Sequence, residues 1–235
     1  MDTKAILKEL ESYGDPRTKN TLINHGAKEP FFGVKVGDLK KILKKTKKNH
    51  ELSLELYATG NTDAMYLAGL MADEKQITKE QLQTWVEQAY WYYLSEYAVP
   101  WVAAETPYGF ELGLEWIRSE KEQIASAGWS ALLNYASIHD DSELDIATYS
   151  NLLDEIGKSI HQQKNRIKYT MNGLVIAGGC YIPDLTEKAK EIAKHIGKVS
   201  VLMGNTSCKV PLATPYIDKV VRSGRMGKKI KNARS

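Results

Sequence analysis

Apolar residues recur along most of this chain at spacings of three and four, the period of one face of an α-helix. The pattern covers residues 7–13, before the helix-breaking sequence Gly14-Asp15-Pro16, and residues 36–43, before Asn49. Sustained alternation of apolar and polar residues, which would indicate strands, is absent from the sequence. The pattern therefore predicts an all-α protein.

From residue 50 onward the predicted helices form pairs. The first helices open around Leu52, Leu82, Leu112 and Leu152. The second helices are rich in small residues and cover residues 63–72, 94–105, 122–137 and 165–179. Small side chains let helices approach closely, and a recurrence every 30 to 40 residues is typical of stacked helical hairpins. We predict a curved solenoid, an alpha-alpha superhelix, with an irregular helical bundle as the alternative.

The composition is that of a folded chain, with 43% hydrophobic and 26% charged residues. Its 235 residues suffice for one compact domain or a short repeat array, and we expect a single domain over residues 1–235. No apolar run reaches the roughly 20 residues of a membrane span, and MDTKAILKEL lacks the features of a signal peptide. We expect a cytoplasmic protein that does not bind membranes.

Charge is distributed unevenly. Residues 1–48 carry twelve lysines and arginines against six acids, residues 49–205 carry twelve against twenty-two, and residues 206–235 carry eight against one. Both ends of the chain are therefore basic and the middle is acidic. A fold that brings the two ends to one surface would create a positive patch suited to a polyanion. The alternative is two basic runs that face water on opposite sides.

Motifs for metal or nucleotide chemistry are lacking. GRMGKK, near the end of the chain, has too short a spacing between its glycines for a phosphate loop and no hydroxyl residue after its lysines. The five histidines are not spaced as metal ligands, and Ser207 and Cys208 have no evident partnering base. We expect neither a metal nor a cofactor.

Aromatic residues crowd around one acidic residue in QAYWYYLSEYAVPW, residues 88–101. On a helix, Tyr92 and Glu96 share one face, and Tyr93 and Tyr97 form the neighbouring stripe. Aromatic faces stack on bases, and a carboxylate stabilises a cationic sugar or activates water. These aromatic and carboxylate side chains would suit an enzyme that cleaves a bond at a nucleoside. The alternative is that the rings fill the core and Glu96 is a solvated acid.

A family resemblance adds to this picture. NHGAKEPFFGVKVGDLKKILKK, residues 24–45, resembles the N-terminal signature of the AlkD-like DNA alkylation repair proteins. The resemblance covers nearly the whole chain and implies HEAT-like helical pairs with a concave surface that holds duplex DNA by its backbone. Enzymes of this family are DNA glycosylases of the 3-methyladenine and 7-methylguanine type, which remove cationic alkylated purines.

The resemblance also implies site residues. The family's catalytic segment resembles Trp-Trp-Asp-Ser-Val-Asp, so Trp91 matches its first Trp, Tyr92 replaces the second, and Glu96 stands in place of the catalytic Asp. A family Arg falls near Ala127 and a family Trp near Gly173, where this chain has neither. The final segment, residues 208–235, resembles that of a distinct subgroup of the family.

These observations predict a monomeric protein that binds double-stranded DNA through phosphates. The expected DNA-binding residues are Lys40, Lys41, Lys44, Lys45, Lys47, Lys48, Arg225, Lys228, Lys229, Lys231 and Arg234. If the protein is an enzyme, the expected reaction is hydrolysis of an alkylpurine N-glycosidic bond, with Glu96, Trp91 and Tyr92 as catalytic residues. The alternatives are a non-catalytic binder of unusual DNA structures and a helical-repeat scaffold for protein partners.

Overall fold

A computed structural model describes residues 1–234; Ser235, the last residue of the predicted domain, lies outside the described residues. Residues 1–234 form helices and no strand. The helices are α1 (Thr3–Ser12), α2 (Pro16–Asn24), α3 (Val36–Thr46), α4 (His50–Ala58), α5 (Thr62–Met71), α6 (Lys79–Gln88), η1 (Leu94–Ala98), α7 (Val99–Ala104), α8 (Gly109–Trp116), α9 (Glu122–Ile138), η2 (Asp141–Glu143), α10 (Ile146–Ser159), η3 (Ile160–Gln162), α11 (Asn165–Tyr181), η4 (Pro183–Leu185), α12 (Thr186–Ile196) and α13 (Ala213–Arg222).

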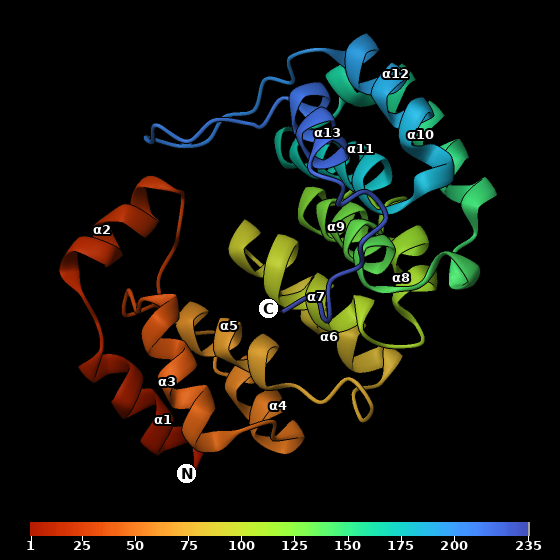
Figure 1. Cartoon of the computed structure of the whole chain (residues 1–235). Helices are drawn as coiled ribbons and strands as arrows, with labels where there is room; N and C mark the ends of the chain where they lie inside the picture. The colour runs from red at the N-terminus through yellow and green to blue at the C-terminus, as the bar shows by residue number, and fades with distance from the viewer. Residues whose placement is uncertain (235) are drawn as a thin grey trace.

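The helices form two layers of one arc (Figure 1). In the inner layer α3, α5, η1 with α7, α9, α11 and α13 each pack on the next. The outer layer consists of α1, α4, α6, α8, α10 and α12, most of which pack on an inner neighbour. The predicted curved solenoid of helical hairpins is therefore confirmed. The four predicted pairs correspond to α4 with α5, α6 with η1 and α7, α8 with α9, and α10 with α11.

Local sequence sets the helix boundaries. At the predicted break, α1 ends at Ser12 and α2 begins at Pro16, whose missing N–H costs nothing at the first position of a helix. The Asp15 carboxylate caps α2 by accepting a hydrogen bond from the Thr18 N–H at 2.7 Å. Because Pro16 and its cap start a new helix, α2 leaves the direction of α1.

The aromatic segment contains an irregular turn. η1 is a π-helical turn in which the Val99 N–H donates to the Leu94 carbonyl. Pro100 follows directly and has no N–H to offer the Glu96 carbonyl four residues earlier. The Ser130 hydroxyl on α9 donates to that carbonyl instead, at 2.5 Å. This turn therefore fixes the backbone of Glu96 against α9.

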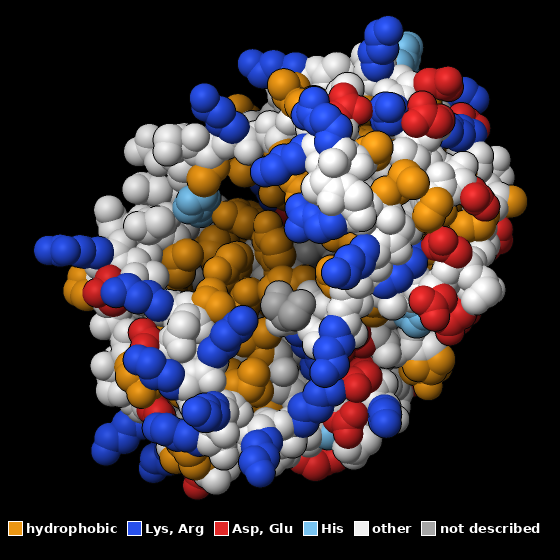
Figure 2. Space-filling model, viewed as in Figure 1, with side chains coloured by type: hydrophobic (Ala, Val, Ile, Leu, Met, Phe, Trp, Pro, Cys, Tyr) orange, Lys and Arg blue, Asp and Glu red, His pale blue; other side chains and the backbone are white. Residues whose placement is uncertain are grey.

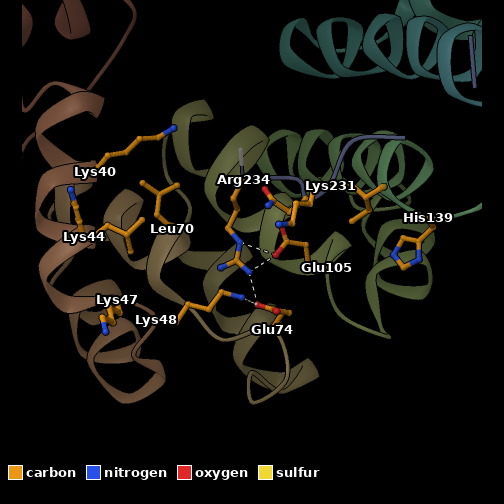
Figure 3. A pocket seen from close by; sticks show the side chains of 13 residues that line it. Lys40, Lys44, Lys47, Lys48, Leu70, Glu74, Glu105, His139, Lys231 and Arg234 are labelled. Carbon is orange, nitrogen blue, oxygen red and sulfur yellow. Dashed lines mark hydrogen bonds and ion pairs between the residues drawn. The ribbon is translucent and has the colours of Figure 1, made fainter. Parts of the chain in front are cut away.

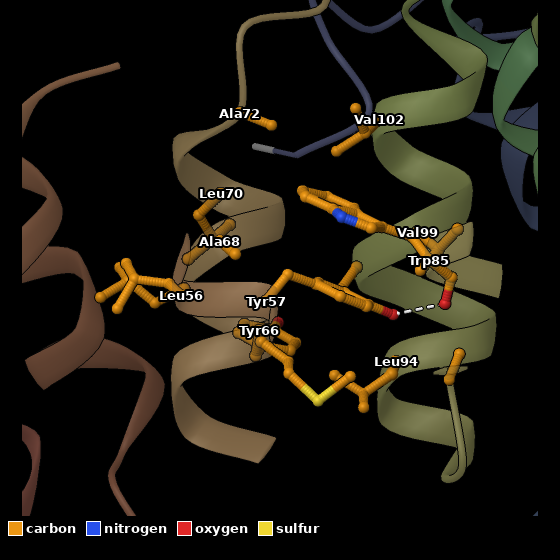
Figure 4. Packing of buried hydrophobic residues seen from close by; sticks show 14 of the residues in the cluster. Leu56, Tyr57, Tyr66, Ala68, Leu70, Ala72, Trp85, Leu94, Val99 and Val102 are labelled. Carbon is orange, nitrogen blue, oxygen red and sulfur yellow. Dashed lines mark hydrogen bonds between the residues drawn. The ribbon is translucent and has the colours of Figure 1, made fainter. Parts of the chain in front are cut away.

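Two apolar clusters make up the core, and α9 contributes to both. Ala127 and Ala131 on α9 pack with the helices before it, whereas Trp129 and Leu132 pack with those after it. In the first cluster, Tyr57 stacks on Trp85 with 4.2 Å between ring centroids (Figure 4). The Tyr57 hydroxyl donates to the Trp85 carbonyl at 2.7 Å, so even this buried polar atom has a partner.

Two irregular segments join distant parts of the arc. The first, which we call the extension (residues 197–212), connects α12 to α13 and reaches across to α2 (Figure 1). There the Asn205 N–H donates to the Asn24 carbonyl at 2.9 Å. The second, the C-terminal tail (residues 223–234), returns from α13 along the inner helices. Within residues 1–234, no helix has the length and apolarity to cross a membrane.

Candidate nucleic-acid interface

A groove of about 770 Å³ lies between α3 and the C-terminal tail (Figure 3). Both basic ends of the sequence therefore lie on one surface, which is one of the two arrangements that the charge distribution allowed. The groove is lined by Lys40, Leu43, Lys44, Lys47, Lys48, Leu70, Glu74, Glu105, Ile138, His139, Lys231, Asn232 and Arg234. Six of these side chains are cationic and two are carboxylates, which gives the groove a net charge of +4 with His139 neutral.

The α3 side of the groove carries lysines available to a ligand. Lys40 and Lys44 are exposed and four residues apart on one face of α3, and the exposed Lys47 lies just beyond the end of this helix. Lys231 is exposed on the opposite side. Among residues 1–234, no carboxylate lies within ion-pair distance of any of these four ammonium groups. Among the described residues, no carboxylate therefore neutralises their charge.

Arg234, by contrast, anchors the tail. Its side chain is 7% exposed, and its guanidinium pairs with the carboxylates of Glu105 and Glu74, the latter at 2.7 Å. It also donates to the carbonyls of Gly69 and Ala72, at the end of α5, at 3.2 and 2.6 Å. Helix C-termini carry partial negative charge and favour such a cation. Arg234 thus lies in the groove but is already fully engaged by protein groups.

The remaining predicted DNA-binding residues are placed differently. Lys41 pairs with Asp38 at 2.7 Å, Lys45 with Glu9 at 2.6 Å, and Lys48 with Glu74 at 2.5 Å, so intramolecular ion pairs engage these lysines. Another part of the tail lines a separate hollow beside Tyr181. This hollow includes Arg225, Lys228 and Lys229.

Lys229 repeats the anchoring role of Arg234. Its ammonium donates to the carbonyls of Ala136 and Tyr181, at 3.0 and 2.7 Å, and pairs with Asp141 at 2.8 Å. Lys229 therefore holds the tail to the ends of α9 and α11. Across the face shown in Figure 2, lysine and arginine side chains border a hollow lined by hydrophobic ones.

The aromatic segment forms a second site, on the inner side of η1. The predicted residues lie together, since Trp91 and Tyr92 meet edge to face with 5.1 Å between ring centroids and Glu96 follows in the next turn. The Trp91 indole N–H donates to the His25 carbonyl at 3.1 Å, and Trp91 is buried. Tyr93 and Tyr97 form the predicted neighbouring stripe, with 5.8 Å between their rings.

An arginine that sequence analysis did not assign to the site occupies its centre. Arg166 on α11 donates through Nε and one terminal nitrogen to the two carboxylate oxygens of Glu96, at 2.6 and 2.5 Å. Its guanidinium also lies between the rings of Tyr92 and Tyr169, 4.2 and 4.5 Å from their centroids. The chain has no Arg near Ala127, which is buried in α9, but α11 supplies one to the same site.

Burial governs the electrostatics of this pair. Glu96 is 3% exposed, and loss of hydration raises its pKa to about 7 although Arg166 attracts the carboxylate. The Glu96 pair raises the pKa of Arg166 despite burial of the guanidinium, so the arginine stays charged. The alternative of a solvated acid does not hold for Glu96. Both carboxylate oxygens are occupied by a cation from the protein itself.

Sequence patterns could not reveal this arrangement, because Arg166 and Glu96 are 70 positions apart. The available signal is the polar start of α11, where Asn165 and Arg166 open a helix that is otherwise rich in small and apolar residues. No group of three or more His, Cys, Asp or Glu residues within residues 1–234 is arranged to hold a metal ion.

Comparison with known proteins adds a family context. The sequence model of the family described as DNA alkylation repair enzymes matches residues 6–209. The uncharacterized proteins Lin0241 of Listeria innocua and Lmo0209 of Listeria monocytogenes are each 35% identical to this chain over 217 residues. Those matches cover 90% of this chain and 93% of each relative.

A solved structure is similar over its whole length. It is described as "A new family of proteins related to the HEAT-like repeat DNA glycosylases with affinity for branched DNA structures". The two chains are 39% identical, the TM-score is 0.91, and the match covers 100% of both.

Proposed function

Because this chain belongs to the DNA alkylation repair family, we propose that it binds branched DNA through the phosphate backbone and does not excise bases. The observation that carries the proposal is the groove between α3 and the C-terminal tail, in which Lys40, Lys44, Lys47 and Lys231 have no acidic partner within residues 1–234. The affinity of the similar solved protein for branched DNA structures supports the choice of ligand.

The groove suits a phosphate backbone in both shape and charge. Phosphates from successive nucleotides follow a groove, and lysines on one helix face meet them without reading the base sequence. Lys40 and Lys44 on α3, Lys47 just beyond its end and Lys231 across the groove contact DNA from two sides.

The aromatic site supports binding without base excision. A glycosylase of this type needs a carboxylate open to the sugar and a space for the cationic base. Here the Arg166 guanidinium has the charge and flat shape of such a base and lies against Glu96 and between two tyrosines. The assignment of Glu96, Trp91 and Tyr92 as catalytic residues stays a prediction. Our proposal gives them a structural role in positioning α11 against η1.

The test compares a four-way junction with a linear duplex of the same length, using fluorescence anisotropy over a range of salt concentrations. The variant Lys40→Gln/Lys44→Gln/Lys47→Gln removes three groove charges. A matched control, Lys8→Gln/Lys158→Gln/Lys194→Gln, removes three exposed lysines from the outer helices α1, α10 and α12.

We expect the wild type to bind the junction more tightly than the duplex, with affinity falling as salt rises. Each lysine that contacts a phosphate contributes about one unit to the slope of log affinity against log salt. The groove variant should therefore lose up to about three units of slope, while the control keeps the wild-type slope. Equal losses in both variants would refute the groove as the binding surface.

Base excision is scored in the same samples with alkylated DNA. Our proposal expects no release of alkylpurine by the wild type. Release that Glu96→Gln abolishes would instead make Glu96 a catalytic residue and the protein a glycosylase. Tight binding of a basic or acidic peptide without binding of any DNA would favour the protein scaffold.

A further inference from the structure

A small pocket lies beside the Arg166 and Glu96 pair, between the inner helices η1 and α7, α9 and α11. Its volume is about 210 Å³, and Pro211 of the extension forms part of its wall. Pockets for drug-sized ligands measure about 300–1,000 Å³, so this one fits a single small ring system. The pocket is separate from the groove between α3 and the C-terminal tail, and the Arg166 and Glu96 pair does not fill it.

The walls of the pocket are aromatic. Tyr97 and Trp101 meet edge to face with 5.6 Å between their ring centroids, and Tyr169 faces them from α11. All three rings are half-buried, so part of each remains accessible from the pocket. Flat heterocycles stack on such rings, and stacking tolerates any base because every base has a π-face.

The pocket also has an unsatisfied hydrogen-bond acceptor. Asn172 is 1% exposed and lines the pocket, and its side-chain oxygen has no hydrogen-bond partner among residues 1–234. Its side-chain nitrogen donates to the Pro211 carbonyl at 3.0 Å, which fixes the amide. Because this oxygen is itself buried, a ligand in the pocket does not reach it, and Asn172 instead holds Pro211 and with it one wall of the pocket.

Gly173 provides the room. A Cβ atom at this position would lie 3.1 Å from a methyl carbon of Leu133, so a longer side chain would be directed into space that the pocket now occupies. The absence of a side chain at Gly173 therefore keeps this wall of the aromatic pocket open.

We propose that this pocket binds an unpaired nucleobase at the branch point of a DNA junction, stacked on Trp101, Tyr97 or Tyr169. The inference rests on the proposed binding of branched DNA and adds a site to it. A paired base cannot enter, because its hydrogen-bonding edge is occupied and its neighbours stay stacked.

The experiment uses the full chain and three-way junctions that carry 2-aminopurine, either unpaired at the branch point or paired within an arm. A distant dye reports binding by anisotropy, and 2-aminopurine fluorescence reports stacking of the base. Free 2-aminopurine deoxyriboside forms a third arm. The variants are Gly173→Leu, which fills the pocket, and Trp101→Leu, which removes one stacking wall.

We expect the unpaired base to be quenched on binding and to raise affinity about tenfold over the fully paired junction. Gly173→Leu and Trp101→Leu should lose the quenching and this gain, while their affinity for the fully paired junction stays at the wild-type level. Circular dichroism and thermal melting verify that both variants fold.

Each contrary result rules out a specific part of the proposal. Wild-type binding without quenching, or equal quenching of paired and unpaired 2-aminopurine, overturns the base pocket and leaves branched-DNA binding intact. Saturable quenching of the free deoxyriboside alone also overturns it, since the pocket would then take a free nucleoside. No anisotropy change with any DNA overturns the proposed function together with the pocket. Because the wild type alone decides these outcomes, they do not depend on the folding of a variant.

Discussion

Arg166 contacts both carboxylate oxygens of Glu96, at 2.6 and 2.5 Å, although helices from different repeats carry the two residues. The pair places a permanent cation between two tyrosine rings, where an alkylated purine would otherwise find an aromatic and anionic surface. The site is thus already neutralised and filled. The pair also connects η1 to α11, whereas the catalytic assignment of Glu96 stays a prediction.

Removing Arg166 alone should be costly. Arg166→Met leaves a carboxylate buried without its cation, and breaking a buried pair in this way destabilises a protein by about 3–5 kcal/mol. The double variant Glu96→Leu/Arg166→Met removes both charges and should recover most of that loss. Urea unfolding of the single and double variants measures the coupling. Additive effects would show that the two side chains act independently.

The pH dependence of stability should report Glu96. Its pKa in the folded protein is raised to about 7 from an ordinary value of 4.5. A raised carboxyl pKa means that the folded state favours the protonated form, so this stabilising contribution is present below about pH 4.5 and is lost as pH rises through 7.

Glu96→Gln lacks this titration. Between pH 5 and pH 8, the wild type should lose up to roughly 3 kcal/mol of unfolding free energy relative to Glu96→Gln. Urea unfolding midpoints of both proteins across this range provide the measurement. Parallel pH curves would contradict the raised pKa.

Arg234 should matter for stability more than for DNA contact. Arg234→Met removes a guanidinium that pairs with Glu105 and Glu74 and caps the end of α5, and we expect a loss of about 3 kcal/mol. Arg225→Met is the matched control, because Arg225 is exposed and donates only to the nearby Ser223 hydroxyl among the contacts described for it. Its effect should stay within about 0.5 kcal/mol. Thermal melting distinguishes the two, and equal effects would argue against anchoring by Arg234.

Asp63 should hold the segment between α2 and α3. Its buried carboxylate accepts hydrogen bonds from the N–H groups of Phe32, Gly33 and Val34, at 2.6, 3.0 and 3.1 Å. Asp63→Asn removes the charge and one acceptor oxygen, which should cost about 2–3 kcal/mol. The exposed Asp184→Asn provides a control with the same chemical change. If urea unfolding gives both variants wild-type stability, these bonds do not contribute as expected.

Local patterns were sufficient to predict the architecture. Spacings of three and four, the Gly14-Asp15-Pro16 break and the small residues of α5, α9 and α11 each act within one helix or between sequence neighbours, where short-range physics decides. The same holds for the aromatic stripe of Tyr93, directly before η1, and Tyr97 on η1. The prediction of one domain over residues 1–235 stays a prediction.

Ion pairs between residues far apart in the chain could not be predicted from the sequence. Nothing near Arg166 indicates a partner 70 residues earlier, and nothing near Arg234 indicates Glu105, 129 residues earlier. These contacts depend on how far each repeat rotates relative to the last, which small packing differences determine. In the structure, nine of the eleven lysines and arginines selected by charge separate into groove lysines without an acidic partner among residues 1–234, surface ion pairs and buried anchors. The other two, Arg225 and Lys228, line the separate hollow beside Tyr181.

The path of the C-terminal tail has a mechanical consequence. The Gly227 and Ile230 N–H groups donate to the carbonyls of Cys180 and Ser137, and Lys229 and Arg234 continue the contacts to the ends of α9, α11 and α5. In a solenoid each repeat contacts only its neighbours, so small movements between successive repeats add up along the arc. A tail that is hydrogen-bonded to several inner helices restrains these movements. We expect the tail to limit how wide the arc opens.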